Sequence, residues 1–143
     1  MVDALSTIKT VLTNNWISSN CDSITPDINY AFEKKLLSLA DNDQIILYEL
    51  ENSIDPFGIG GIEYADLNTV SIDIRTTNKR SEINTIRAHL IKLKDEVLRI
   101  IKANLSNPDS DYCLAVLRRK KDLSDRGNGV GRMVIDVQLR RYA

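Results

Sequence analysis

Residues 70–83, VSIDIRTTNKRSEI, combine a strand pattern with the start of a helix pattern. In the first half, three β-branched residues alternate with polar ones, which is the period of a strand with one buried face. The other face is expected to be open and to hold Asp73 and Arg75. In the second half, a polar turn leads into a long helix. The stretch therefore predicts a sheet with a helix packed on it.

The helix that follows has the clearest apolar stripe of the chain. Ser81 is its expected N-cap, and the helix is expected to end near Asn104, before the turn SNPDSD. Because such a stripe needs a partner surface, we expect the helix to cover a sheet face. The stripe repeats at spacings of three and four, at Ile83, Ile86, Leu90, Leu93, Val97 and Ile100.

A further helix and three more strands are predicted from similar patterns. The helix runs from Asp3, its expected N-cap, to Trp16. Strands are expected at 44–51, 111–119 and 132–142. The segment 28–40 fits both strand alternation and helical period, so its type stays open. The apolar stripe of the first helix is Leu5, Ile8, Leu12 and Trp16.

These elements predict an α+β fold. We expect a two-layer sandwich in which two helices cover one face of a mostly antiparallel four-stranded sheet. At 143 residues the chain is expected to form a single domain, 1–143. Two connections, 52–69 and 120–131, are long for a domain of this size and rich in glycine and charge. We expect binding partners to order them.

The composition excludes several classes of protein. Hydrophobic residues make up 43% of the chain, but no run approaches the ~18 apolar residues of a membrane span. The first residues lack the basic start and apolar core of a signal peptide. We therefore expect a soluble, cytoplasmic protein with no membrane partner. Cys21 and Cys113 form neither a CxxC pair nor a zinc pattern, so both are expected to be buried or half-buried thiols.

The net charge of −1 conceals a gradient along the chain. Residues 1–69 have a net charge of −8, residues 70–117 of +2, and residues 118–143 of +5. Oppositely charged regions of one chain can form the two sides of a self-association interface. The simpler interpretation is that these charges are scattered over a solvated surface.

Two glycine runs and the single histidine resemble chemical sites only superficially. The runs at 58–61 and 127–131 lead toward strands and lack the helix and lysine of a phosphate-binding loop. His89 lies beside the stripe position Leu90, and nothing in the sequence places a nucleophile and a carboxylate around it. We interpret it as a helical residue flanking the stripe.

Asp122 and Asp125 are candidates for a cation site or an acid pair. No third and fourth oxygen ligand follows at the spacing of a calcium loop. They are therefore expected to neutralise the neighbouring basic residues. We expect no enzyme activity, no metal and no cofactor.

The basic run RRKK at 118–121 is the best candidate for nucleic-acid contact, since phosphate contacts need only clustered cations. Base stacking would also need exposed aromatic residues, and only Tyr142 is near in sequence. Alternatively, these charges guard a strand edge against aggregation. The other basic residues of this region are Arg126, Arg132, Arg140 and Arg141.

The residue patterns of several motifs, and their order along the chain, resemble those of a known family. They are an N-terminal amphipathic helix ending in Trp16, TPDI at 25–28, QIILYELE at 44–51, the stretch 70–83, KKDLSDRG at 120–127 and RMVIDVQLRR at 132–141. The chain resembles the tail-terminator and head–tail neck proteins of tailed bacteriophages and tailed archaeal viruses. It resembles the archaeal-virus branch more than the lambdoid one.

The resemblance implies a structural role in a virion. Such proteins form rings, commonly six-fold, at the head-proximal end of the tail tube. The ring ends tube polymerisation and joins the tube to the neck or connector, while genomic DNA passes through without sequence-specific binding. The implied partners are copies of the chain, the tail tube protein and the connector, and the implied location is the virion, with assembly in the host cytoplasm.

The resemblance also implies interfaces instead of an active site. An acidic half and a basic half suit a head-to-tail contact that closes into a ring. Two alternatives stay open: another neck subunit or tail component of a contractile machine, and a small nucleic-acid-binding α+β domain that uses its basic C-terminal strand. The candidate subunit or tube contacts are Asp73, Arg75, Arg118, Arg119, Lys120, Lys121, Asp122, Asp125 and Arg126.

Overall fold

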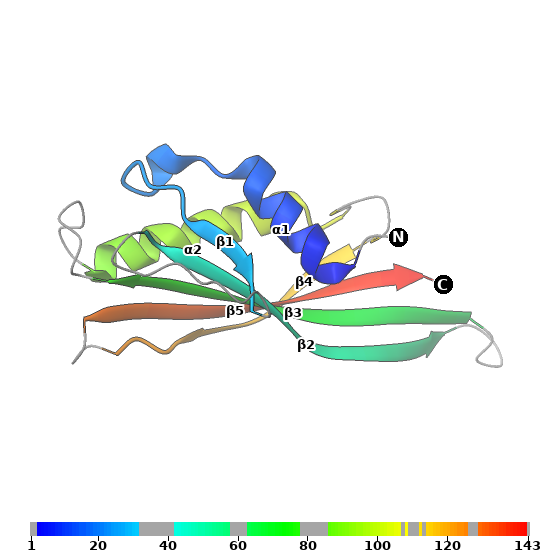
Figure 1. The fold of residues 1–143 in the computed structure, drawn as a ribbon. Helices are drawn as coiled ribbons and strands as arrows, with labels where there is room; N and C mark the ends of the chain where they lie inside the picture. The colour runs from blue at the N-terminus through cyan, green and yellow to red at the C-terminus, as the bar shows by residue number, and fades with distance from the viewer. Residues whose placement is uncertain are drawn as a thin grey trace.

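A five-stranded sheet and two helices form the two layers of the computed structural model (Figure 1). The structure describes residues 3–31, 42–57, 63–77, 86–106, 108, 112, 114–125 and 129–142. No helix among these residues is long and apolar enough to cross a membrane. In chain order the elements are α1 (Ala4–Asn15), the 3₁₀ helix η1 (Ser18–Asn20), β1 (Asp27–Tyr30), β2 (Gln44–Phe57), β3 (Glu63–Thr77), α2 (Ile86–Ala103), β4 (Leu114–Asp122) and β5 (Val130–Tyr142).

The strand order of the sheet is β1-β2-β3-β5-β4. β1 pairs with β2 in parallel, and the other three pairings are antiparallel. The predicted α+β class is confirmed, but the predicted number of four strands is wrong. The fifth strand, β1, lies at the start of the segment 28–40, whose type the pattern left open; residues 32–41 lie outside the described part.

Helix α1 begins where the sequence predicts. The Asp3 carboxylate caps it by accepting a hydrogen bond from the Ser6 backbone N–H at 2.7 Å. Ile8 and Leu12 are fully buried against the sheet, and Trp16, just past the helix, packs at the rim of the core. The predicted stripe is therefore the face that covers the sheet.

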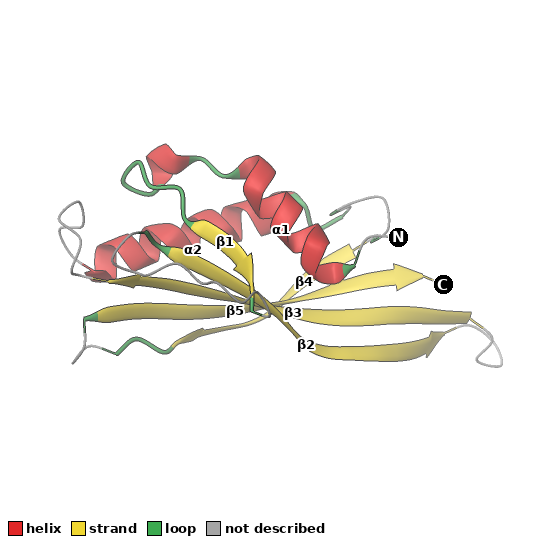
Figure 2. Cartoon of the chain, in the orientation of Figure 1, coloured by secondary structure: helices red, strands yellow, loops and turns green. Residues whose placement is uncertain are grey.

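Helix α2 lies on the same side of the sheet as α1, as Figure 2 shows. Its described part ends at Ala103, beside the predicted end, and the Asn104 side chain bonds the Ile100 carbonyl at 2.7 Å. The expected start at Ser81 lies outside the described residues. The buried residues of the stripe are Leu90, Leu93, Val97 and Ile100.

The core lies between the helices and one face of the sheet. Val70, Ile72 and Ile74 on β3 are fully buried there, as their alternation predicts. β5 adds Ile135, Val137 and Leu139 to the same face. Burying such side chains stabilises a fold by about 1.5–3 kcal/mol each before the entropy of ordering is subtracted.

The strands are longer than predicted. β2 and β3 form a hairpin whose pairing continues to Phe57 and Glu63, so the predicted 18-residue connection 52–69 is wrong. The far end of this hairpin extends beyond α1 (Figure 1). β4 likewise continues to Asp122, and a bridge between Asp125 and Val130 shortens the predicted loop 120–131. Cross-strand pairing therefore extends into the described parts of both connections.

Candidate subunit interface

Asp73 lies on the sheet face turned away from the helices, between two arginines. Arg75 and Arg132 occupy directly opposed positions on β3 and β5, where two like charges repel. The Asp73 carboxylate accepts bonds from Arg132 Nε and Nη2 at 3.0 and 2.8 Å and from Arg75 Nη2 at 2.9 Å. The Asp73 side chain is 1% exposed. The prediction that its position is open to a neighbour is therefore wrong.

The electrostatic effect of this cluster is visible in Arg132. The hydrogen bond to Asp73 raises the pKa of the guanidinium above its ordinary value and outweighs the effect of burial. Asp73 thus holds two cations against the sheet, and its charge is compensated within the subunit. The bonds between Arg132 and Asp73 join β5 to β3, whereas the bond between Arg75 and Asp73 lies within β3. A contact of Arg75 with a neighbouring subunit stays a prediction.

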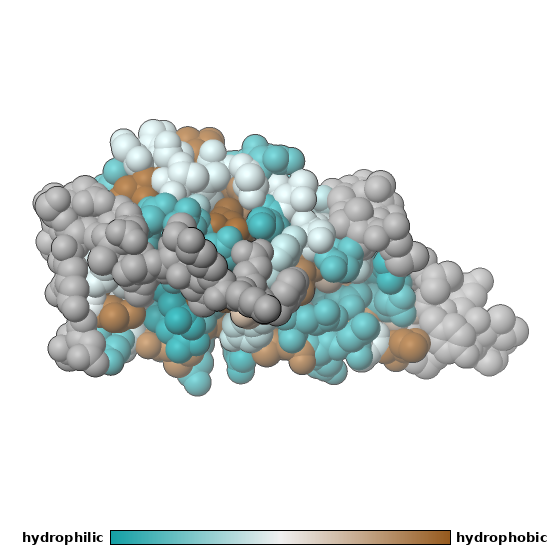
Figure 3. Space-filling model, in the orientation of Figure 1, coloured by the Kyte–Doolittle hydropathy of each residue, from teal (hydrophilic) through white to brown (hydrophobic). Residues whose placement is uncertain are grey.

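A second acidic residue of the same face, Asp136 on β5, lies opposite Arg119 on β4. Arg119 donates to Asp136 Oδ2 from Nε at 3.0 Å, and Arg118 donates to the Gln138 amide oxygen at 2.6 Å. Among the described residues, five buried side-chain polar atoms have no hydrogen-bond partner: Asp27 Oδ2, Gln44 Nε2, Ser71 Oγ, Arg75 Nε and Asp136 Oδ1. The lower margin of Figure 3 shows hydrophilic and hydrophobic residues mixed on this side.

The basic run 118–121 lies on β4, the outermost strand of the sheet. All four side chains are exposed, and a register shift between Leu117 and Arg119 leaves Arg118 in a bulge. Within the described part of the chain, neither Lys120 nor Lys121 forms an ion pair. The structure therefore brings the four predicted cations together on one edge.

The acidic members of the predicted set lie just beyond this edge. The Asp122 carboxylate accepts a bond from the Ser124 backbone N–H at 2.9 Å, and Asp125 is exposed at the bridge to Val130. Arg126 lies outside the described residues. The predicted ion pairs of Asp122 and Asp125 with their basic neighbours stay a prediction.

A second edge, on β2, was not predicted from the sequence. β1 pairs only with residues 44–47, so residues 48–57 of β2 have no described strand on their outer side. Glu49 and Glu51 are exposed there, and a register shift leaves Leu50 between them unpaired. Leu50 is 48% exposed and Ile54 is 64% exposed. The sequence signal for this edge is the mixture of acidic and apolar residues in YELENSID, 48–55. The turn-forming residues that follow it favour a loop, so the pattern does not predict a strand there.

His89 lies at the centre of a buried charge cluster. Its Nδ1 is 2.8 Å from Asp22 Oδ2, and its Nε2 is 2.5 Å from Asp43 Oδ2. The Thr76 hydroxyl donates to the other Asp43 oxygen at 2.6 Å. His89 is 1% exposed, so the interpretation of this residue as a mere flank of the stripe is wrong.

The protonation of His89 follows from its surroundings. Burial lowers the pKa of the imidazole, but the hydrogen bonds to Asp43 and Asp22 raise it more, so the pKa lies above its ordinary value. Both ring nitrogens face carboxylates, which leaves neither free to take a proton from a nucleophile. The cluster connects α2 to the start of β2 and to the turn after η1. This geometry suits a structural role of His89 better than a role as catalytic base.

The turn that contacts His89 has an unusual backbone. Asp22 and Ser23 have φ values of 53° and 62°, in the left-handed region that non-glycine residues rarely adopt. Hydrogen bonds from Lys92, at 2.6 Å, and then from His89 lower the pKa of Asp22. Neighbouring Cys21 is fully buried, as predicted, and burial raises the pKa of its thiol to about 12. Cys113 lies outside the described residues.

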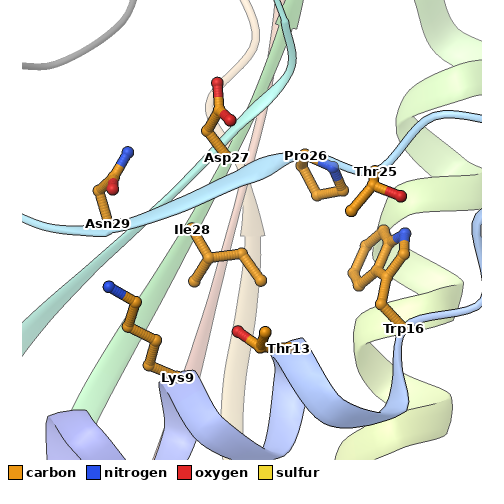
Figure 4. A pocket seen from close by; sticks show the side chains of 8 residues that line it. All are labelled: Lys9, Thr13, Trp16, Thr25, Pro26, Asp27, Ile28 and Asn29. Carbon is orange, nitrogen blue, oxygen red and sulfur yellow. The ribbon is translucent and has the colours of Figure 1, made fainter.

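A shallow groove of about 390 Å³ separates α1 from β1 (Figure 4). Lys9 and Thr13 border it from α1 and Trp16 from just past the helix, and Ile28 points toward the helix from β1. The Trp16 indole N–H donates to the Ile24 carbonyl at 3.2 Å, which fixes the groove wall. The Asp27 carboxylate, at the β1 side of the groove, points away from Thr13 (Figure 4).

Comparison with known proteins bears on the fold. No protein-family model matches the chain, and no curated protein matches its sequence. Among solved structures, a chain of the virion of a native gene transfer agent (GTA) particle is similar, with a TM-score of 0.61 and 8% sequence identity. The superposition covers 98% of this chain and 95% of that chain. At this identity the similarity shows a shared fold over nearly the full length of both chains.

Proposed function

We propose that this protein is a structural subunit of a tailed virion. The observation that supports this proposal is the full-length fold similarity to a chain of a gene transfer agent virion. The resemblance of the sequence motifs to tail-terminator and neck proteins supports the same role.

Within the virion, we assign the subunit to a ring at the head-proximal end of the tail tube. The ring ends tube polymerisation and joins the tube to the neck or connector. Such a subunit works through contacts with copies of itself and with its neighbours, and it needs no active site. Exposed, oppositely charged strand edges on β2 and β4 suit this role, because distinct patches on one chain produce head-to-tail contacts.

Electron microscopy of particles produced with and without the intact gene tests this proposal. We expect deletion to give tails of uncontrolled length and heads without tails, and complementation to restore normal particles. Normal tail lengths on tails that fail to join heads would indicate another neck subunit. Unchanged infectious particles would contradict a structural role.

The exposed basic edge of β4 favours a second candidate, a nucleic-acid-binding domain. In that case the isolated protein binds duplex DNA with an affinity that falls steeply with salt, because bound cations release counterions from the phosphates. The double variant Lys120→Glu/Lys121→Glu should then abolish DNA binding. A ring subunit that lets DNA pass freely should show weak binding with or without these lysines.

A further inference from the structure

The sheet has two unpaired outer edges of opposite charge within its described part. One is the outer side of β2 from residue 48 onward, where Glu49 and Glu51 are exposed. The other is β4, where the four basic residues 118–121 are exposed. The two edges lie on opposite sides of the sheet, because the strand order is β1-β2-β3-β5-β4 and β1 covers only the first four residues of β2.

Both edges also expose apolar side chains. Leu50 and Ile54 lie on the acidic edge, and Leu123, which is 38% exposed, directly follows the basic edge. Exposed apolar residues flanked by charge are typical of surfaces that bind a protein partner. Apolar contact can supply affinity, while the charges set orientation and the rate of encounter.

We propose that the acidic edge of β2 in one subunit binds the basic edge of β4 in a second copy. This inference rests on the proposed function, in which copies of the chain form a ring, and it names the surfaces that meet. Such a contact is head-to-tail, so it generates a closed ring or an open chain of subunits. β2 and β4 run in opposite directions in the sheet, so the two edges meet antiparallel when the sheet continues around the ring.

The contact depends on side chains more than on a backbone ladder. Register shifts between Glu49 and Glu51 and between Leu117 and Arg119 interrupt the row of backbone groups on both edges. Charged side chains and bulges are the features that keep edge strands from pairing indiscriminately. A partner with the opposite charge pattern neutralises these charged side chains, and the opposite edge of a second copy of the chain has that pattern.

Charge exchange tests the contact directly. One variant makes the β2 edge basic, Glu49→Lys/Glu51→Lys, and another makes the β4 edge acidic, Lys120→Glu/Lys121→Glu. All four side chains are exposed, so both variants should fold, which circular dichroism checks. The control for charge reversal is Asp95→Lys, an exposed position on α2 outside both edges.

Sedimentation velocity at low salt, up to millimolar protein, measures the result. We expect the wild type and the control to associate and each edge variant to weaken association by at least about tenfold. Combining all four substitutions in one chain, or mixing the two edge variants, should restore association. Association that is unaffected by the edge variants, or a wild type that stays monomeric at millimolar concentration, overturns the edge contact. Neither outcome removes the proposed function, which the particle morphology decides separately.

Discussion

His89 Nε2, on α2, lies 2.5 Å from Asp43 Oδ2, and both side chains are buried. With Asp22 at the other ring nitrogen, the imidazole links three segments of the chain. A buried cation with two carboxylate partners makes the stability of the protein depend on pH.

The pH dependence has a definite sign. Because the pKa of His89 is raised on folding, its stabilising effect is complete below the unfolded value, about 6.5, and declines as pH rises through the folded value. The pKa of Asp22 is lowered, so its stabilising effect exists above about pH 3.9 and declines as pH falls through the folded value. Together they stabilise the fold most in the window between those two unfolded values.

The variant His89→Gln tests whether the buried imidazole is charged. We expect the difference in unfolding free energy between wild type and variant to be larger at mildly acidic pH than at pH about 9. Urea denaturation across this range measures it, and Arg87→Gln, an exposed position on the same helix, is the control. The same difference at both pH values would refute a charged His89 in the folded protein.

Removal of the Asp73 charge should destabilise the sheet. In Asp73→Asn, Arg75 and Arg132 keep their charges at directly opposed positions without a carboxylate between them. Breaking a buried ion pair from one side typically costs about 3–5 kcal/mol; because both arginines are partly exposed, we expect a value at the lower end. The matched control is Asp66→Asn, which removes a partly exposed pair with Arg141 and should cost about 1 kcal/mol or less. If denaturant titrations gave equal losses of stability for Asp73→Asn and Asp66→Asn, the Asp73 cluster would have no special stabilising role.

Gly131 marks a close approach between α2 and the sheet. A Cβ at this position would lie 3.0 Å from Thr76 Cγ2 and 3.2 Å from Ile86 Cγ1. We expect Gly131→Ala to destabilise the protein by about 1–3 kcal/mol, the usual cost of overpacking. The substitution Thr76→Ser removes the nearest methyl group but keeps the hydroxyl that bonds Asp43. Gly131→Ala should therefore cost less stability in the Thr76→Ser background than in the wild type. Additive costs in thermal unfolding would exclude this steric explanation.

Cys21 should be unreactive in the folded state. Burial raises the pKa of its thiol to about 12, so almost no thiolate exists at pH 8. In the background Cys113→Ser, we expect a thiol reagent to label the native protein very slowly and the urea-unfolded protein at once. Rapid labelling of the native protein would show that the turn at Asp22 and Ser23 opens readily.

The sequence patterns predicted those parts of the fold in which local period and burial agree. The alternation at Val70, Ile72 and Ile74 and the stripe at Leu90 and Leu93 place these side chains in the core, as the structure confirms. The far half of β2 escaped prediction because the turn-forming residues of 52–57 favour a loop locally, whereas pairing with β3 overrides that preference.

The charge clusters could not be predicted, because their members are distant in sequence. His89 is 67 residues from Asp22 and 46 from Asp43, and neither carboxylate stands out in its own segment. The alternation of residues 70–75 predicts the correct strand face for Asp73, but only the register of β3 against β5 shows that Arg132 lies beside it. The basic edge was found because its four cations are consecutive, whereas the acidic edge was hidden in a strand predicted to end early.

The position of β5 inside the sheet has a consequence for biosynthesis. β5 pairs with β3 on one side and β4 on the other, and its partners in β3 precede it by 53 to 77 residues. Until residues 130–142 have left the ribosome, β3 lacks one neighbour and β4 lacks its only described one. The nascent chain therefore cannot complete its hydrophobic layer early, and chaperones have a long interval in which to bind the exposed strands.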